Sequence, residues 1–351
     1  MLKSKSYFKV FGAAVATVGA LSSLAACGGS SESSSESSSD SVESNGLVTV
    51  YTGRHYGIEP VFEKFTAETG IEVRFTTGGD PELRARLEAE GANTPADLVM
   101  TSDAANIALA SAANLLSPVE SEVLAESIPE ELRAQDNSWF ALSGRLRVIM
   151  SSSERVTNAP QTYAEVGDPQ WKGKLCLRPS THPYTQSLVA GLINNVGAVE
   201  ARKIVDSWVA NNPLYINSDT DILKAVVAGD CDIALANSYY LGRLLSEDAA
   251  FPVTLTWPDQ KGNGAHLNIS AAGVTANAPN RANAVVLLEW LASKGQKLFS
   301  DANNEFPADP RVEPVAVIAG FGLFIADTKS VRVLGELNTQ AVELLSAARY
   351  E

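Results

Sequence analysis

The sequence has few of the residues on which most metal sites and catalytic centres depend. Its 351 residues include three cysteines, three histidines and three methionines. It contains neither CxxC spacing nor a cluster of Cys and His, which argues against a zinc site. It also contains no GxSxG elbow, HExxH motif, Walker loop or GxGxxG loop, so nothing in it favours an enzyme of those classes.

Positive charge is scarce as well. The chain has 27 Lys and Arg against 41 Asp and Glu, a net charge of −14. Residues 1–26 hold three Lys and no acid, so without them 24 basic residues face 41 acidic ones and the net charge is −17. A body this acidic does not bind nucleic acid by neutralising phosphates. Its charge suits a cationic cargo, although most acidic proteins are simply soluble ones.

The N-terminus lacks an apolar run long enough to span a membrane stably. Three lysines in "MLKSKSYFK" precede a short apolar stretch that ends at Cys27. This layout predicts a lipoprotein signal peptide over 1–26, because "LAAC" (24–27) resembles a bacterial lipobox. Residues 27–46 follow as the lipidated Cys27 and a disordered Ser-rich acidic tether. We therefore expect an exported protein on the periplasmic or extracytoplasmic face of the membrane, anchored through Cys27.

Strands and helices alternate from Leu47 onward, which predicts an α/β fold with mainly parallel sheets flanked by helices. Gly70 is expected to end the first helix, and Asp80 to cap the second. The length favours two lobes rather than one. Residues 139–153 and 267–279 are expected to be the two strands that cross between them.

Two cysteines remain once Cys27 is assigned to lipid. Cys176 and Cys231 each lie in a short apolar run that is typical of a strand. An oxidising compartment favours a disulfide between them, and two free buried thiols are the alternative.

Histidine and tyrosine gather where predicted strands end. His55 and Tyr56 follow the first strand, His182 and Tyr184 follow "KLCLRPS", and Tyr239 and Tyr240 follow "CDIALANS". Loops at the carboxyl ends of parallel strands converge on one site in such folds. If Ser238 caps a helix, both tyrosines of the pair occupy its first turn and can face that site.

These residue types favour a trivalent metal. A phenol ordinarily titrates near pH 10, and a highly charged cation can deprotonate it at neutral pH. Phenolate is a hard anion that suits Fe³⁺, whereas zinc prefers Cys or more His and calcium prefers carboxylates. Arg54 or Arg145 could offset the negative charge, or either could be an ordinary structural ion pair. His182 could support the ligands, and His266 has no partner visible in the sequence.

Each residue also has a simpler interpretation. His55 could be a loop histidine bonded to backbone, Tyr184 could shield the core, and the Tyr239–Tyr240 pair could stack on a sugar. Tyr51, Tyr163 and Tyr215 are expected to be packing residues.

Several motifs in order resemble the bacterial ferric-iron-binding proteins of ABC importers. They are "TVYTGRHY", "TPADLVMTSDAANI", "ALSGRLRVI", "DPQWKGKLCLRPS", "YTQSLVA", "CDIALANSYYLG" and "NEFPADPRVEP". The resemblance implies the two-lobed periplasmic-binding-protein type II fold. It places lobe 1 at 47–145 and 272–315, and lobe 2 at 146–271 and 316–351, with a C-terminal helix in lobe 2.

The resemblance also implies a set of iron ligands, which it carries onto His55, Tyr56, Tyr184, Tyr239 and Tyr240. Arg54, Arg145 and Asn237 are expected around them. Two positions depart from the family pattern. Ser102 stands where one subclass has a Glu ligand and an added anion, and Thr185 stands where Asn is expected.

The function implied is capture of Fe(III) between the lobes and delivery to a membrane permease, by a monomer that binds no nucleic acid. Two alternatives stay open. The nearer is a protein of the same fold that binds a small organic solute such as a sugar or polyamine. The more distant is an exported enzyme, for which the sequence offers no motif.

Overall fold

The structure is a computed structural model that describes residues 46–54 and 57–351. Several predictions concern residues outside these ranges and are therefore not addressed by the structure. They are the signal peptide over 1–26, the lipidated Cys27 and its tether, and the two ligand candidates His55 and Tyr56.

The described strands form one mixed sheet in the order β2-β1-β3-β9-β4-β7-β5-β6, with β8 and β10 paired to β4 and β11 paired to β9. Their bounds are β1 Leu47–Thr52, β2 Glu72–Thr77, β3 Leu98–Thr101, β4 Phe140–Ser152, β5 Leu175–Leu177, β6 Leu214–Tyr215, β7 Ile233–Asn237, β8 Val253–Thr256, β9 Ala265–Val274, β10 Phe306–Pro307 and β11 Ala326–Asp327. Parallel pairing joins β2, β1 and β3 in one half, and β7, β5 and β6 in the other.

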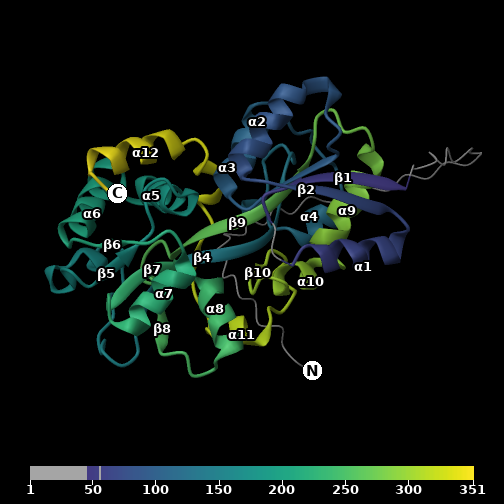
Figure 1. The fold of residues 1–351 in the computed structure, drawn as a ribbon. Coiled ribbons are helices and arrows are strands. Elements are labelled where there is room, and N and C mark those ends of the chain that lie inside the picture. Colours follow the sequence, from purple (N-terminus) through teal and green to yellow (C-terminus); the bar gives the residue numbers. More distant parts are fainter. Residues whose placement is uncertain (1–45, 55–56) are drawn as a thin grey trace, which may run out of the picture.

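Two long strands connect these halves. β4 and β9 pair with each other in antiparallel register and are buried along their whole length. β9 also pairs with β3, and β4 also pairs with β7, so each long strand extends one half of the sheet. Figure 1 shows both strands running from one half of the molecule into the other. They correspond to the crossing segments predicted at 139–153 and 267–279.

The helices cover the faces of the sheet, so the expected α/β architecture is confirmed. Around β1, β2 and β3 lie α1 Glu59–Thr69, α2 Asp80–Glu90, α3 Ala104–Ala112, α4 Glu122–Ser127, α9 Arg281–Ala292 and α10 Gln296–Asp301. Around the other half lie α5 Pro183–Val196, α6 Ala198–Ala210, α7 Asp219–Ala228, α8 Ser238–Glu247, α11 Ala316–Ala319 and α12 Asn338–Ala347. Single 3-10 turns occur at Gly91–Asn93, Glu130–Leu132, Glu165–Gly167, Pro169–Trp171 and Val331–Val333.

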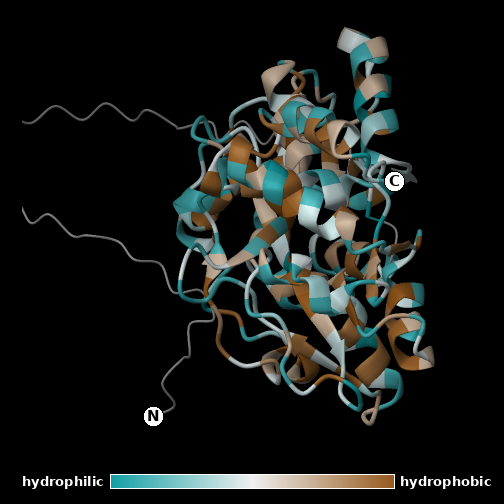
Figure 2. Ribbon diagram, turned by 90° about the vertical axis from the view of Figure 1, so that its left-hand side faces the viewer, coloured by the Kyte–Doolittle hydropathy of each residue, from teal (hydrophilic) through white to brown (hydrophobic). Residues whose placement is uncertain are grey.

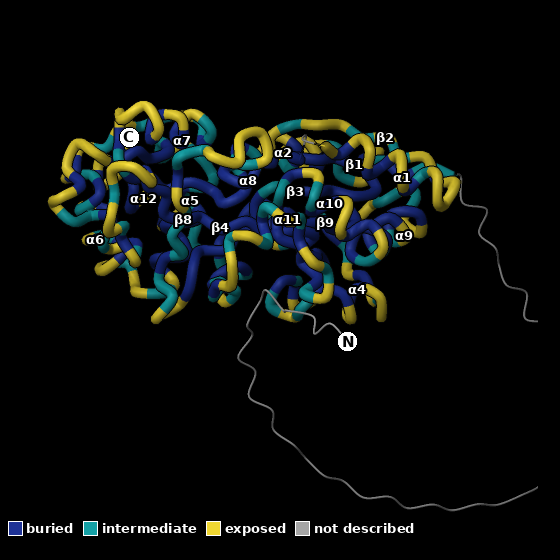
Figure 3. The backbone as a smooth tube through the Cα atoms, turned by 90° about the horizontal axis from the view of Figure 1, so that it is seen from below, coloured by how far each residue is buried: buried dark blue, intermediate teal, exposed yellow. Residues whose placement is uncertain are grey.

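Burial follows the sequence pattern of each element. Figure 2 shows helices in which hydrophilic and hydrophobic residues alternate, as expected of helices with one face on a core. In α1 the buried face consists of Val61, Phe62 and Phe65. Figure 3 shows buried backbone along β4 and β9 and exposed backbone over the outer helices and turns. The core therefore lies along the sheet, which fixes the strand ends relative to one another.

Two helix starts differ from the sequence prediction. Asp80 is not the cap of α2: Gly79 precedes the helix, and the Asp80 carboxylate accepts hydrogen bonds from the backbone and hydroxyl of Ser102. Ser238 is likewise inside α8, because Asn237 precedes the helix and the Ser238 hydroxyl accepts from the backbone of Leu146. In both cases a contact with a residue distant in the sequence, either in a strand or just after one, replaces the local cap. The prediction that Gly70 ends α1 is confirmed, since Gly70 adopts the left-handed conformation with φ 74°.

Cys176 lies in β5, and Cys231 lies two residues before the start of β7, the strand that pairs with β5. Their sulfur atoms are 2.10 Å apart and their Cα atoms 5.8 Å apart, which is the arrangement of a disulfide. Among the residues that the structure describes, no helix has both the length and the apolar character needed to cross a membrane.

Candidate functional site

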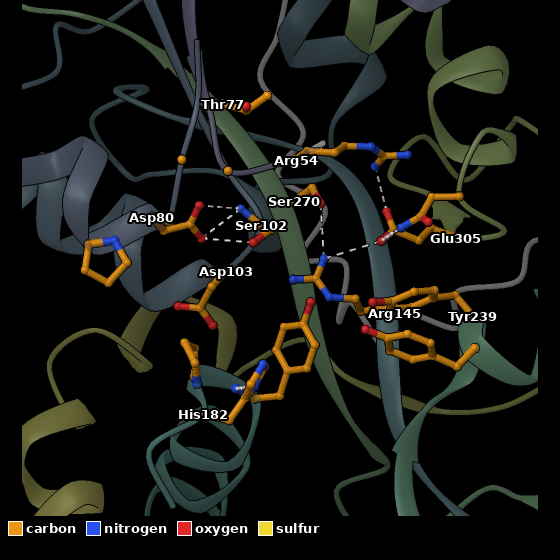
Figure 4. Close-up of a pocket in the computed structure, with 18 of the residues that line it drawn as sticks. Arg54, Thr77, Asp80, Ser102, Asp103, Arg145, His182, Tyr239, Ser270 and Glu305 are labelled. Atoms are coloured by element: carbon orange, nitrogen blue, oxygen red, sulfur yellow. Dashed lines mark hydrogen bonds and ion pairs between the residues drawn. The ribbon is translucent and has the colours of Figure 1, made fainter. Parts of the chain in front are cut away.

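A cavity of about 560 Å³ opens where the carboxyl ends of the parallel strands from both halves face each other. Figure 4 shows Asp80 and Ser102 on one wall, Tyr239 on the opposite wall, and Arg145 between them. The residues that line the cavity are Gly53, Arg54, Thr77, Gly78, Gly79, Asp80, Pro81, Ser102, Asp103, Arg145, Arg178, His182, Pro183, Tyr184, Tyr239, Tyr240, Ser270, Asn303 and Glu305.

Tyr239 and Tyr240 line this cavity from the first turn of α8. Strand β7 is buried throughout and ends at Asn237, so the helix begins at the cavity wall. The two rings stack, with centroids 4.0 Å apart and planes inclined by 30°. Adjacent residues on a helix are about 100° apart, and both rings reach the cavity because they lie in its first turn. The geometry expected for this pair is therefore observed.

Tyr184 lines the cavity from the first turn of α5, which follows β5. His182 precedes this helix, and its Nδ1 accepts a hydrogen bond from the backbone N–H of Tyr184. The His182 and Tyr184 rings meet edge to face at 4.5 Å. Three of the five predicted ligands, Tyr184, Tyr239 and Tyr240, thus border one cavity. The other two, His55 and Tyr56, lie outside the described residues.

Of the three residues predicted to lie around the ligands, two line the cavity and one does not. Arg54 and Arg145 both line the cavity and are both buried. Asn237 is not among the lining residues; its amide oxygen lies 3.5 Å from Nη1 of Arg147. Thr185 donates to the carbonyl of Arg178 over 3.4 Å, which holds the turn before α5. His266 is buried with its Nε2 3.0 Å from the hydroxyl of Ser187.

Glu305 is the centre of a buried charge network that the sequence did not reveal. Its Oε2 lies 2.8 Å from Arg54 Nη1, and its Oε1 lies 3.7 Å from Arg145 Nη1. Arg54 also donates to the carbonyl of Phe299 and stacks over the ring of that residue at 3.9 Å. Burial opposes ionisation of Glu305, but Arg54 and Arg145 outweigh it and lower the pKa of this carboxyl below its usual value. One carboxylate thus fixes two guanidinium groups at the cavity wall.

A second acidic group, Asp80, faces the cavity from the start of α2. It is buried, accepts from Ser102, and has no cation within salt-bridge distance among the described residues. Burial and then the charge of Asp103 raise the pKa of Asp80 to about 7. Ser102, the position where the sequence resemblance implies a Glu ligand in one subclass, donates to Asp80 through its backbone N–H and its hydroxyl.

The three phenols share one electrostatic property. Burial raises the pKa of Tyr184, Tyr239 and Tyr240 above the ordinary value for tyrosine. Arg145 opposes this effect at Tyr184 and Tyr239. In the absence of a further cation the phenols are therefore neutral at pH 7. A strongly charged cation bound among them would shift them to the ionised form.

The histidines are neutral for a similar reason. Burial, followed by the charge of Arg178, lowers the pKa of His182 to about 3. Burial and Arg147 lower the pKa of His266 to about 3 as well. His182 lines the cavity as a neutral imidazole, in contact through Nε2 with Nη2 of Arg178 at 2.6 Å.

The cavity also contains residues that the sequence interpretation did not single out. They include Arg178, Asn303, Glu305, Asp103 and Ser270. Arg178 lies in "KLCLRPS" and Glu305 lies in "NEFPADPRVEP", two of the motifs that resemble the ferric-iron-binding proteins. Their place in these motifs could have indicated that they belong to the site. Among residues 46–54 and 57–351, no group of three or more His, Cys, Asp or Glu could hold a metal ion. The donor groups that line the cavity are three phenols, the imidazole of His182, and the carboxylates of Asp80, Asp103 and Glu305.

Comparison with known proteins shows that this chain is similar to bacterial solute-binding proteins, several of which are described by iron. The family described as "Bacterial extracellular solute-binding protein" matches residues 61–319. Iron uptake protein A1 of Synechocystis sp. is 37% identical, over 99% of this chain and 99% of its own. The Trichodesmium protein described as IdiA or FutA, solved with iron and citrate ligands, is 39% identical with a TM-score of 0.82, covering 87% of this chain and all of its own.

A further solved relative is ferric iron-binding protein A of Mannheimia haemolytica, in an open conformation. It is 33% identical with a TM-score of 0.79, over 86% of this chain and 98% of its own. These likenesses confirm the two-lobed architecture expected from the sequence.

Proposed function

The chain belongs to the bacterial extracellular solute-binding proteins, and from this premise we propose that it binds Fe(III) in the cavity and delivers it to the permease of an ABC transporter. The family binds solutes and does not catalyse reactions. The observation that carries the proposal is the convergence of Tyr184, Tyr239 and Tyr240 on one cavity. The printed descriptions of the Synechocystis, Trichodesmium and Mannheimia proteins all name iron, so the organic-solute alternative is not favoured.

The proposed ligands are the phenolate oxygens of Tyr56, Tyr184, Tyr239 and Tyr240 and the imidazole of His55. Support comes from the cavity wall, which Tyr239 lines as a buried residue and Tyr184 and Tyr240 line as partly exposed ones. Four phenolates on Fe(III) carry a net charge of −1. Arg145 supplies a buried positive charge beside them, because Tyr184 and Glu305 outweigh the effect of burial and raise its pKa above the usual value.

The proposal includes the division of the chain into lobes. Lobe 1 comprises 47–145 and 272–315, and lobe 2 comprises 146–271 and 316–351. In this division Tyr56 and His55 come from lobe 1, and the other three ligands come from lobe 2. Iron therefore favours the closed arrangement, since only closure brings both sets to one ion.

The proposal also includes export. The signal peptide over 1–26 is removed, Cys27 is lipidated, and the acidic tether holds a monomeric body near the membrane. In that oxidising compartment Cys176 and Cys231 persist as a disulfide.

A visible spectrum with metal quantification tests this function. Tyrosinate bound to Fe(III) absorbs visible light by charge transfer, whereas a complex with a sugar or polyamine is colourless. We expect purified protein to carry about one iron per chain and a visible band, and to lose both in citrate at mildly acid pH. Protein that gains neither iron nor a band when Fe(III) is offered would contradict the function.

Tyr240→Phe tests the ligand assignment. It removes one anionic ligand, and iron should be lost to a competing chelator more than roughly tenfold faster. Tyr215→Phe is the matched control, because Tyr215 lies outside the cavity lining and packs against Tyr350 at 5.0 Å. Equal iron retention in both variants would remove Tyr240 from the ligand set.

A further inference from the structure

Asp219 is a fully buried acid beneath the cavity, at the start of α7. It is not a lining residue, and so it does not contact the cargo directly. Its Oδ2 accepts from Arg147 Nη1 at 2.5 Å and from the backbone N–H of Asn237 at 3.0 Å. Its Oδ1 lies 3.5 Å from Nε of Arg178. One carboxylate therefore contacts three different segments of the chain.

Two of these segments carry the proposed tyrosine ligands. The backbone of Asn237 ends β7, two residues before Tyr239. Arg178 follows β5, and its guanidinium contacts His182 and the carbonyl of Asn217. His182 in turn accepts from the backbone N–H of Tyr184. Contacts thus run from Asp219 in one direction to Tyr184 and in the other to the Tyr239–Tyr240 pair.

Arg147 fixes this arrangement to the long strand β4. Its Nη2 donates to the carbonyl of Leu235 in β7 at 2.6 Å, and its Nη1 binds Asp219. Both arginines are buried, with side-chain exposures of 3% for Arg147 and 6% for Arg178. Among the described residues, Asp219 is the carboxylate within salt-bridge distance of both arginines. Its removal would leave two buried positive charges unpaired, which is strongly destabilising.

We propose that Asp219 is a positioning residue that sets the distance between the Tyr184 loop and the Tyr239–Tyr240 helix start, and thereby the geometry of the iron site. This inference rests on the proposed function. Residues around a metal site that orient its ligands change metal affinity without touching the metal. Asp219 does so for two ligand segments at once, through Arg178 and through the backbone of Asn237.

The chain contains a matched control at the other end of the same two strands. Asp232 precedes β7 and pairs with Arg155 at 2.8 Å and with Lys174, just before β5, at 3.4 Å. It is thus also an acid between two cations, but it lies at the amino ends of β5 and β7, away from the cavity. The partners of Asp232 are more exposed, at 33% for Arg155 and 53% for Lys174, so Asp232→Asn controls for the loss of an acid at these strands and not for the loss of a buried charge. The visible band per bound iron distinguishes ligand positioning from lost stability.

The experiment compares Asp219→Asn with Asp232→Asn in the iron-loaded protein. The measurements are the visible band per bound iron, the rate of iron loss to citrate, and the thermal midpoint. We expect Asp219→Asn to shift the band and to lose iron about 10- to 100-fold faster, with Asp232→Asn close to the wild-type protein. The band per bound iron reports ligand geometry, and a decrease in the folded fraction does not change it.

A folded Asp219→Asn protein with wild-type band and release rate would overturn the inference, as would equal changes in both variants. If Asp219→Asn does not fold, Arg178→Gln replaces it, because that change keeps the Arg147–Asp219 pair and cuts the connection to Tyr184. A wild-type band and rate in Arg178→Gln would then overturn the inference. Failure of the wild-type protein to bind iron is a separate result and contradicts the proposed function itself.

Discussion

The guanidinium carbon of Arg145 lies 5.2 Å from the centre of the Tyr184 ring. Arg145 comes from β4 and is almost completely buried, so its charge is poorly screened by water. Burial raises the pKa of Tyr184, and the charge of Arg145 opposes that rise. Arg145, held in the buried strand β4, therefore favours the ionised form of the proposed ligand Tyr184.

Arg145→Gln should make iron binding more sensitive to acid. Without the cation the pKa of Tyr184 is higher, so protons compete with iron at a higher pH. We expect the pH midpoint of iron loss to rise by roughly one unit, with release to citrate at pH 7 about tenfold faster. Visible absorbance followed during a pH titration measures this midpoint.

Arg155→Gln is the control for that titration. Arg155 forms an ion pair with Asp232, is about one-third exposed and is not one of the residues that line the cavity. Its midpoint should match the wild-type protein within the error of the titration. An unchanged midpoint in Arg145→Gln would show that Arg145 only packs against the tyrosine.

The site was predictable from the sequence where its chemistry is local. Tyr239 and Tyr240 follow a buried strand and lie in the first turn of a helix, where positions about 100° apart let both rings reach the same site. Tyr184 was predictable on the same grounds. Glu305 was not, because its partner Arg54 is 251 residues away and no periodicity connects them. Asp219 was missed for a similar reason, since it meets Arg147 across 72 residues.

The failed cap predictions have the same physical origin. Asp80 has the residue type and position of a helix cap, and local preference alone favours that role. In the structure its carboxylate instead accepts from Ser102, 22 residues away. A buried strand end offers unpaired N–H groups that must be satisfied, and this requirement outweighs a local cap.

Asp80→Asn should stabilise the iron-free protein more at pH 8 than at pH 5. Burial and then the charge of Asp103, only partly offset by the hydrogen bonds from Ser102, raise the pKa of Asp80 to about 7, above the unfolded value near 4. The folded protein therefore binds more protons than the unfolded chain between these values, and stability falls as pH rises through that window. The neutral amide does not titrate, so the variant gains up to about 4 kcal/mol relative to wild type by pH 8.

Urea unfolding of both proteins at pH 5, 6, 7 and 8 measures this difference. Other carboxylates titrate equally in the two proteins and cancel. A stability difference that stays constant from pH 5 to pH 8 would mean that Asp80 is ionised throughout, with a pKa below the window.

Gly53→Ala should displace Asp80. A Cβ at position 53 would lie 1.6 Å from Oδ1 of Asp80, which is too close for any two heavy atoms that are not bonded. The carboxylate must move away from Ser102, so we expect a loss of about 1–3 kcal/mol. The double variant Gly53→Ala with Asp80→Ala removes the clash, and its loss should be smaller than the sum of the single losses. Additive losses in urea unfolding would refute the clash.

Replacing Cys176 and Cys231 together by alanine should lower stability without altering the iron site. The bridge closes a loop with a sequence separation of 55 residues, for which chain entropy predicts a loss of about 4 kcal/mol. The two sulfurs join β5 to the segment just before β7, whereas the tyrosines lie in the helices that follow these strands. Below its lower melting temperature the variant should therefore keep the visible band per bound iron.

A reductant is the control for this comparison. It should lower the stability of the wild-type protein and leave the stability of the variant unchanged. If the wild-type protein keeps its stability in reductant, even after brief unfolding, the two thiols are free.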